Sequence, residues 1–173
     1  MVLRPAPVRQ AIVVMGVSGC GKSTLGRALS DALGWGFIEG DMLHPAANIL
    51  KMSAGIPLDD ADRWPFLERV GRAIAQARDR GVVAACSALK HRYRDLIVSL
   101  AGEVAFVLPV VDREQLLARV THRGGHFMPP SLLDSQLADL EPPQSDEHAI
   151  LIDGTAPTHE QVARVLDALP GAG

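Results

Sequence analysis

The sequence is poor in cysteine, and it has neither a long apolar run nor an excess of basic charge. Cys20 and Cys86 are the only cysteines, so we expect no disulfide framework and take a reducing cytoplasm as the compartment. The apolar runs are far shorter than the roughly 20 residues of a membrane-spanning helix. With a formal net charge of −3, the chain has no basic field for nucleic acid. These absences predict a cytoplasmic protein with neither a membrane nor a nucleic-acid partner.

The composition that is present is ordinary for a globular protein, with 47% hydrophobic and 21% charged residues. The length of 173 residues is most simply one domain with a substantial core. Residues 1–9 contain two prolines and little to bury. We therefore expect a flexible N-terminal arm, followed by a single domain over residues 10–173.

Short apolar runs alternate with amphipathic segments of helical length along this domain. Such runs are typical of strands buried on both faces, and the alternation predicts parallel βα units. We expect an α/β fold of three layers, with helices on both faces of a central five-stranded parallel sheet. The predicted strands are residues 11–15, 36–39, 82–86, 104–110 and 149–153. The predicted helices are residues 22–33, 46–53, 60–79, 90–100, 112–122 and 158–169, with caps at Asp59 or Asp60, Asp112 and Thr158.

The segment GVSGCGKS, residues 16–23, fits the phosphate-binding pattern G-x-x-x-x-G-K-[ST] between a predicted strand and a predicted helix. Its glycines let backbone N–H groups surround the β-phosphate, and the helix N-terminus adds positive potential. We expect Lys22 to reach the β- and γ-phosphates, Ser23 to ligate Mg²⁺ and Thr24 to help at the α-phosphate. The pattern predicts that a nucleoside triphosphate is bound by Gly16, Ser18, Gly19, Cys20, Gly21, Lys22, Ser23 and Thr24.

The stretch EGDMLHP, residues 39–45, places two carboxylates and a histidine where a predicted strand ends. Small-molecule kinases of this architecture hold the acceptor beyond the strand ends, beside the γ-phosphate. Asp41 is suited to accept a proton from an acceptor hydroxyl, and Glu39 to hold an Mg²⁺-bound water. The alternatives are a loop aspartate that caps the following helix and, for His44, a residue that stabilises the turn.

Basic residues recur at the same edge of the predicted sheet. Arg63 falls in the first turn of a predicted helix, where the macrodipole disfavours a cation unless an anion binds it. Lys90 and Arg94 are four residues apart, which places them on one face of the next helix. Three cations near one cleft can hold a carboxylate or phosphate on the acceptor. The alternative is that each is a solvated helix residue.

A third cluster, ARVTHRGGHF, carries Arg119 and Arg123 ahead of paired glycines. We interpret it as a mobile lid over about residues 119–130 that brings cations to the phosphates and excludes water. The alternative is a surface helix end where the macrodipole favours basic residues.

Five motifs occur in order along the chain: MGVSGCGKST, GDMLHPAANILKMSAGIPLDDADRWPF, CSALKHRYRD, RGGHFMPPSLLDSQLADLE and the DE of PPQSDEHAI. From about residue 12 to residue 169 the chain closely resembles bacterial gluconokinases of the thermoresistant type, P-loop small-molecule kinases that convert D-gluconate and ATP to 6-phospho-D-gluconate. The resemblance implies a nucleoside-monophosphate-kinase-like fold, Mg·ATP as the donor and a homodimer. It implies catalytic roles for Asp41, as the base, and for Lys22 and Arg123, with Arg119 and Arg123 near ATP. It also implies gluconate contacts from Asp41, His44, Arg63, Lys90, Arg94, Gly125, His126 and Gln136.

Two positions depart from the family pattern. RWPF has Trp64 and Phe66 where the family commonly has PW, and Cys20 stands where serine is common. Neither removes a polar group that the chemistry needs. The competing interpretations are a kinase for shikimate, adenylylsulfate or a nucleoside monophosphate, and a non-catalytic ATP-binding regulatory module. For the adenine ring we expect backbone contacts from residues 153–157.

Overall fold

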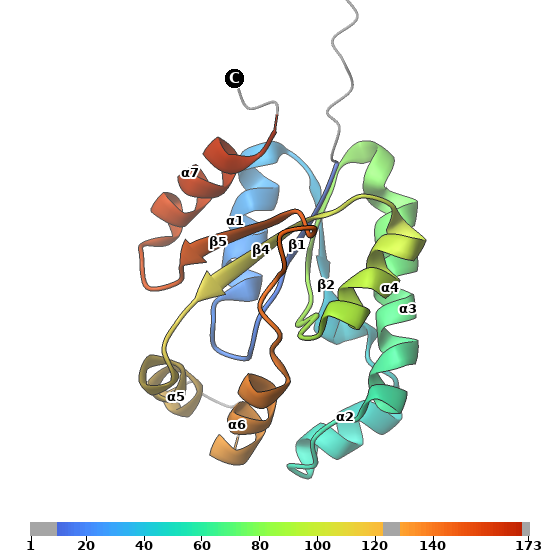
Figure 1. Cartoon of the computed structure of the whole chain (residues 1–173), viewed down its shortest axis with the longest axis vertical. Coiled ribbons are helices and arrows are strands. Elements are labelled where there is room, and N and C mark those ends of the chain that lie inside the picture. The colour runs from blue at the N-terminus through green and yellow to red at the C-terminus, as the bar shows by residue number, and fades with distance from the viewer. Residues whose placement is uncertain (1–9, 123–128, 171–173) are drawn as a thin grey trace, which may run out of the picture.

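The computed structural model describes residues 10–122 and 129–170, and the predicted N-terminal arm lies outside them. Its centre is a five-stranded sheet in the order β2-β3-β1-β4-β5 (Figure 1). All neighbouring strands pair in parallel. The strands are β1 (Ala11–Val14), β2 (Gly36–Glu39), β3 (Val82–Ala85), β4 (Ala105–Val110) and β5 (Ala149–Asp153). The predicted α/β class and the five-stranded parallel sheet are therefore confirmed.

Helices cover both faces of the sheet, as Figure 1 shows. One face is packed by α1 (Lys22–Leu33) and α7 (Thr158–Ala168), and the other by α3 (Asp60–Ala77) and α4 (His91–Ala101). In the central strand β1, Ile12 packs on the face covered by α1 and α7, and Val13 packs on the face covered by α3 and α4. Residues on both faces of this strand are therefore buried. This is why the strands are apolar throughout. In the described parts of the chain, no helix is long and apolar enough to cross a membrane.

Shorter elements gather beyond the carboxyl ends of the strands. They are the 3₁₀ turn η1 (Gly40–Leu43) and the helices α2 (Ala46–Ser53), α5 (Arg113–His122) and α6 (Pro130–Asp139), while a second 3₁₀ turn, η2 (Arg78–Arg80), follows α3. The helices α5 and α6 pack on the phosphate-binding loop through a third apolar cluster that includes Val17, Leu116 and Leu133. The fold thus places helices around the loop that is expected to hold phosphate.

The predicted helix boundaries agree with the structure to within two residues, and two of the predicted caps are confirmed. Asp59 accepts a hydrogen bond from the Asp62 N–H, and the Asp62 carboxylate accepts one from the Asp59 N–H, which forms a capping box. The Asp112 carboxylate accepts from the Gln115 N–H. The cap predicted at Thr158 is wrong, because α7 already begins at this residue, after Pro157.

Helix α6 was not predicted from the sequence. The paired prolines at 129 and 130 indicated a break, but Pro130 is the first residue of the helix. Proline is favoured at that position because its missing N–H would have had no partner there and its fixed φ suits a helix. Leu133 is buried in the same apolar cluster as Val17 of the phosphate-binding loop and so anchors α6 to it, and Leu132 is buried as well.

Candidate active site

The loop between β1 and α1 has the backbone of a phosphate cradle. Gly16, Gly19 and Gly21 have φ values of +131°, +84° and +94°, which favour glycine strongly. At Gly16 a Cβ would also lie 2.8 Å from the Cys20 sulfur atom. The Lys22 Nζ donates to the Val17 carbonyl at 3.0 Å, so the lysine is folded over the loop. The glycine spacing recognised in the sequence therefore corresponds to a tight, inward-turned loop at the start of α1.

Two cavities flank this loop. The smaller, of about 360 Å³, is lined by Gly19, Gly21 and Thr24 together with Arg119, Gly154 and Gln161. The larger, of about 560 Å³, is lined by Ser18 and Lys22 together with Asp41, His44, Arg63 and Gln136. Because the loop contributes to both, a phosphate chain held by it would have one cavity on each side. This arrangement suits a nucleotide in the smaller cavity and an acceptor in the larger.

The smaller cavity is organised by two polar side chains. Arg119 of α5 donates to the Gly19 carbonyl at 3.0 Å and to the Gly154 carbonyl at 2.8 Å. Gln161 of α7 is buried and donates to the Ala156 carbonyl at 2.8 Å. These bonds tie the segment after β5 to the phosphate-binding loop. Of residues 153–157, which were predicted to contact adenine, Gly154 and Ala156 line this cavity, and the adenine contact itself stays a prediction. Gln161 was not predicted because its role depends on tertiary contacts.

Asp41 reaches the larger cavity because the chain turns sharply after β2. A Cβ on Gly40 would overlap the Ala85 carbonyl oxygen, so only glycine lets η1 pass over the end of β3. Burial raises the pKa of the Cys86 thiol to about 12, and the charge of Asp41 adds to this rise while that of Lys22 opposes it. The Asp41 carboxylate and the Lys22 ammonium group are therefore both close enough to the buried Cys86 thiol to affect its pKa. Asp41 itself is exposed to the cavity.

His44 lies in the wall of the same cavity and is held by packing. Its ring stacks on Phe66, with the ring centroids 3.7 Å apart. Burial lowers the pKa of His44, so the neutral ring is favoured. The Asn48 amide nitrogen lies 3.2 Å from His44 Nδ1 and also donates to the Asp62 carbonyl. With Nδ1 as an acceptor, the neutral ring keeps Nε2–H as its donor.

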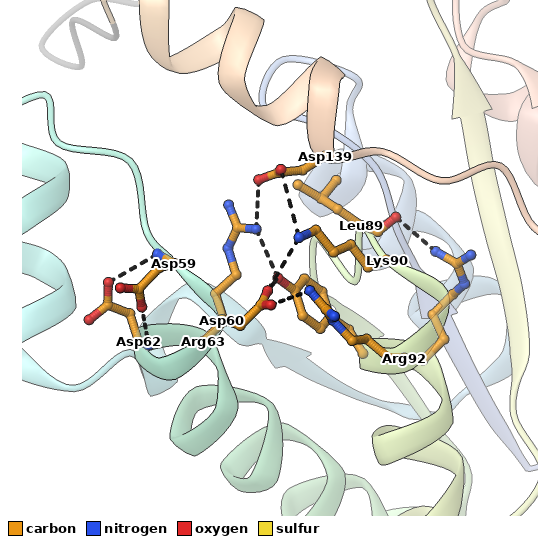
Figure 2. Close-up of polar contacts among 10 residues, drawn as sticks. Asp59, Asp60, Asp62, Arg63, Leu89, Lys90, Arg92 and Asp139 are labelled. Atoms are coloured by element: carbon orange, nitrogen blue, oxygen red, sulfur yellow. Dashed lines mark hydrogen bonds and ion pairs between the residues drawn. The ribbon is translucent and has the colours of Figure 1, made fainter.

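Arg63 is the cation of α3 that lines the larger cavity. Its Nη1 donates to the Tyr93 hydroxyl at 3.1 Å and to Asp139 Oδ2 at 2.8 Å (Figure 2). Lys90 is not among the lining residues, and its Nζ lies 3.3 Å from Asp60 Oδ1 and 4.0 Å from Asp139 Oδ1. Arg63 and Lys90 therefore belong to one charged cluster, but of these two only Arg63 lines the larger cavity.

The predicted substrate contact from Arg94 is not supported. Its side chain is only 1% exposed and lines neither cavity. The guanidinium instead binds Glu147 through Nε at 2.5 Å and the carbonyls of Ala88, Leu89 and Glu141. The predicted common face with Lys90 fails because Lys90 precedes α4 with an extended backbone, while Arg94 lies inside the helix.

Ser23 lies in the first turn of α1 and lines neither cavity, and the other predicted residues outside the phosphate-binding loop are placed as follows. Glu39 lines neither cavity and lies 3.7 Å from Arg27, so its link to Mg²⁺ stays a prediction. Gln136 lines the larger cavity, and its Oε1 accepts from the Ser18 N–H at 2.8 Å. Residues of the predicted lid, Arg123, Gly125 and His126, lie outside the described part of the chain.

Comparisons with known proteins agree with this geometry. An AAA domain family model matches residues 12–143. The chain is 46% identical over 145 residues to the thermosensitive gluconokinase of Escherichia coli, an alignment that covers 82% of this chain and 77% of the relative. It is 47% identical over 145 residues to the gluconokinase of Gluconobacter oxydans, with 83% and 82% covered.

Solved structures add to this agreement. A gluconokinase from Sinorhizobium meliloti matches with a TM-score of 0.85 and 48% identity, covering 96% of this chain and 93% of that one. A shikimate kinase from Aquifex aeolicus, at 18% identity and a TM-score of 0.59, shares the fold alone. The chain therefore belongs to the gluconokinase family of P-loop kinases.

Proposed function

We propose that this protein transfers the γ-phosphoryl group of ATP to the 6-hydroxyl group of D-gluconate. The hydroxyl oxygen attacks the γ-phosphorus, the bond to the β-phosphate oxygen breaks, and ADP leaves. The hydroxyl proton passes to the Asp41 carboxylate, while Lys22 stabilises the charge on the transferred group. Gluconokinases of two organisms at 46% and 47% identity support this choice of acceptor.

The observation that carries the proposal is the pair of cavities on the two sides of one phosphate-binding loop. The polar lining of the larger cavity suits an open-chain sugar acid. Arg63 offers guanidinium donors for one carboxylate, and His44 and Gln136 offer groups that can bind sugar hydroxyls. Asp41 supplies a carboxylate in the cavity that Lys22 of the loop also lines.

We also propose that Mg²⁺ accompanies the nucleotide. Mg²⁺ takes one or two protein oxygens, together with phosphate oxygens and water. The donors present fit this requirement, since the Ser23 hydroxyl lies in the first turn of α1, directly after Lys22, and Asp41 lines the same cavity as Lys22. Bound there, the ion would neutralise phosphate charge, with Ser23 as ligand and Glu39 or Asp41 holding its water.

A coupled assay of ADP release tests the acceptor directly. Gluconate should support turnover at least about tenfold faster than related sugar acids, shikimate, adenylylsulfate or nucleoside monophosphates. The control reaction contains ATP and magnesium without an acceptor and measures background hydrolysis. If another acceptor outpaced gluconate, the substrate assignment would be wrong. If no acceptor raised ADP release above the control, a non-catalytic ATP-binding role would replace it.

The assembly and the compartment are the remaining parts of the proposal. The resemblance to gluconokinases supports a homodimer, which sedimentation equilibrium would show as twice the mass of 18.5 kDa. Two free cysteines, both buried, support residence in the reducing cytoplasm. A monomeric mass over the micromolar range would contradict the dimer.

A further inference from the structure

Arg63 and Asp139 each occupy the helix end that disfavours their charge. Arg63 lies in the first turns of α3, and Asp139 is the last residue of α6. The helix macrodipole disfavours a cation near the N-terminus and an anion at the C-terminus. The two side chains compensate each other, with Arg63 Nη1 2.8 Å from Asp139 Oδ2. The position of each charge is therefore not explained by the stability of its own helix.

The pair belongs to a larger charged cluster, shown in Figure 2. Asp60 pairs with Lys90 and Arg92 and accepts from the Tyr93 hydroxyl, and Lys90 also lies 4.0 Å from Asp139. Among the described residues, the three cations and two carboxylates of this cluster leave a formal charge of +1. One carboxylate on an acceptor would balance it.

Arg63 has protein partners on one part of its guanidinium only. Of the five N–H donors of an arginine, those on Nη1 are used by Tyr93 and Asp139, and among the described residues Nε and Nη2 have no hydrogen-bond acceptor. Arg63 lines the larger cavity, which is proposed to hold the acceptor, whereas Asp139 does not. Asp139 therefore holds the guanidinium from outside the cavity.

We propose that Asp139 is a positioning residue that fixes the Arg63 guanidinium so that its Nε and Nη2 donors receive the carboxylate of the acceptor. The inference rests on the proposed gluconokinase function. An unfixed arginine must lose rotamer freedom when a ligand binds, and a preorganised one does not. Gln136 lies one turn before Asp139 on α6 and lines the same cavity, so the ion pair also fixes this helix against α3.

The first test is Asp139→Asn, which keeps the shape of the side chain and removes its charge. The KM for gluconate should rise about tenfold, because a charge-assisted hydrogen bond becomes a neutral one. The KM for ATP and kcat should stay within about twofold, since the nucleotide cavity is separate. Asp139→Glu keeps the charge and should restore the gluconate KM to within about threefold of the unaltered value.

Asp134→Asn is the matched control. Asp134 also lies on α6 and forms an ion pair, with Arg113 at 2.7 Å, but it lines neither cavity. Its substitution should leave both KM values unchanged, and melting temperatures of all variants would show that each is folded. An equal rise of the gluconate KM in the control would overturn the inference.

A double-mutant cycle tests whether Asp139 acts through Arg63. In the background of Arg63→Ala, adding Asp139→Asn should raise the gluconate KM no further. Independent, multiplying effects would overturn the positioning role, and so would a lower gluconate KM in Asp139→Asn alone, which would make Asp139 a competitor of the substrate. Absence of gluconate turnover in the unaltered protein would instead overturn the proposed function, so the two failures are distinguishable.

Discussion

Replacing Arg94 by methionine separates a structural arginine from a substrate-binding one. The Arg94 side chain is 1% exposed and that of its partner Glu147 is 7% exposed. The guanidinium also binds the carbonyls of Ala88, Leu89 and Glu141. Ala88 has a φ of +43°, an unusual conformation for a residue with a side chain, so this arginine fastens a strained connection between β3 and α4.

The expected loss of stability in Arg94→Met follows from the burial of the ion pair between Arg94 and Glu147. Removing one partner of a buried ion pair is destabilising by about 3–5 kcal/mol, because the other charge stays uncompensated. In a protein of this size 1 kcal/mol corresponds to about 2–4 °C in melting temperature. Arg94→Met should therefore lower the melting temperature by roughly 6–20 °C. Methionine fills most of the vacated volume, so the loss reports the charge and its hydrogen bonds.

Urea unfolding and thermal melting measure this loss, and Arg72→Met is the matched control. The Arg72 side chain is 67% exposed and lies 3.7 Å from Glu68. An exposed pair of this kind contributes about 0–1 kcal/mol. The double variant Arg94→Met/Glu147→Met should regain much of the stability, because apolar residues often replace a buried ion pair without loss.

A different result would refute this reasoning. If Arg94→Met melted within about 2 °C of the unaltered protein while its gluconate KM rose, Arg94 would be the substrate contact that the sequence indicated. If the double variant were less stable than either single one, the uncompensated charge would not be the cause of the loss.

Three further outcomes are expected. Asp41→Asn should lower kcat at least about a hundredfold, the lower range for proton transfer by a side chain, with an unchanged melting curve because Asp41 is exposed. Gly40→Ala should lower both melting temperature and kcat, because its Cβ would overlap the Ala85 carbonyl oxygen. Burial alone would raise the pKa of Glu147, but hydrogen bonds led by that from Arg94 hold it below its usual value. Glu147 therefore stabilises the fold above its unfolded pKa of about 4.3, and urea unfolding should show its advantage over Glu147→Gln fading as the pH falls from about 5 to 3. A pH-independent difference would contradict this linkage.

The features that could be predicted from the sequence are those set by neighbouring residues. The phosphate-binding loop is a contiguous motif whose glycines are required by local backbone geometry. The strands could be located because both cores of the sheet are filled by adjacent residues of the same run, such as Ile12 and Val13. The cap at Asp59 could be predicted because its hydrogen-bond partner, Asp62, is only three residues further along the chain.

The features that could not be predicted depend on distant partners. Arg94 and Glu147 are separated by 53 residues, so the spacing around Arg94 gives no indication of this ion pair. Asp139 lies on α6, which was not predicted because Pro129 and Pro130 indicated a break in the chain. Its contact with Arg63, 76 residues away, therefore had no local signal. The sequence indicated that Arg63 and Lys90 lie at one edge of the sheet, but neither their partners Asp60 and Asp139 nor which of these charges face the cavity.

Counting the N–H donors in use distinguishes Arg94 from Arg63 and Arg119 in the described part of the chain. All five N–H groups of an arginine are used on Arg94, through Nε, two contacts of Nη1 and two of Nη2. Among the described residues, Arg63 uses only its Nη1 donors, and Arg119 uses one contact from each terminal nitrogen. A fully bonded guanidinium can bind a ligand only by breaking buried hydrogen bonds, whereas Arg63 and Arg119 each line a cavity and keep N–H groups without an acceptor among the described residues. The count therefore supports the proposed ligand contacts of Arg63 and Arg119, and it assigns Arg94 to stabilising the connection between β3 and α4.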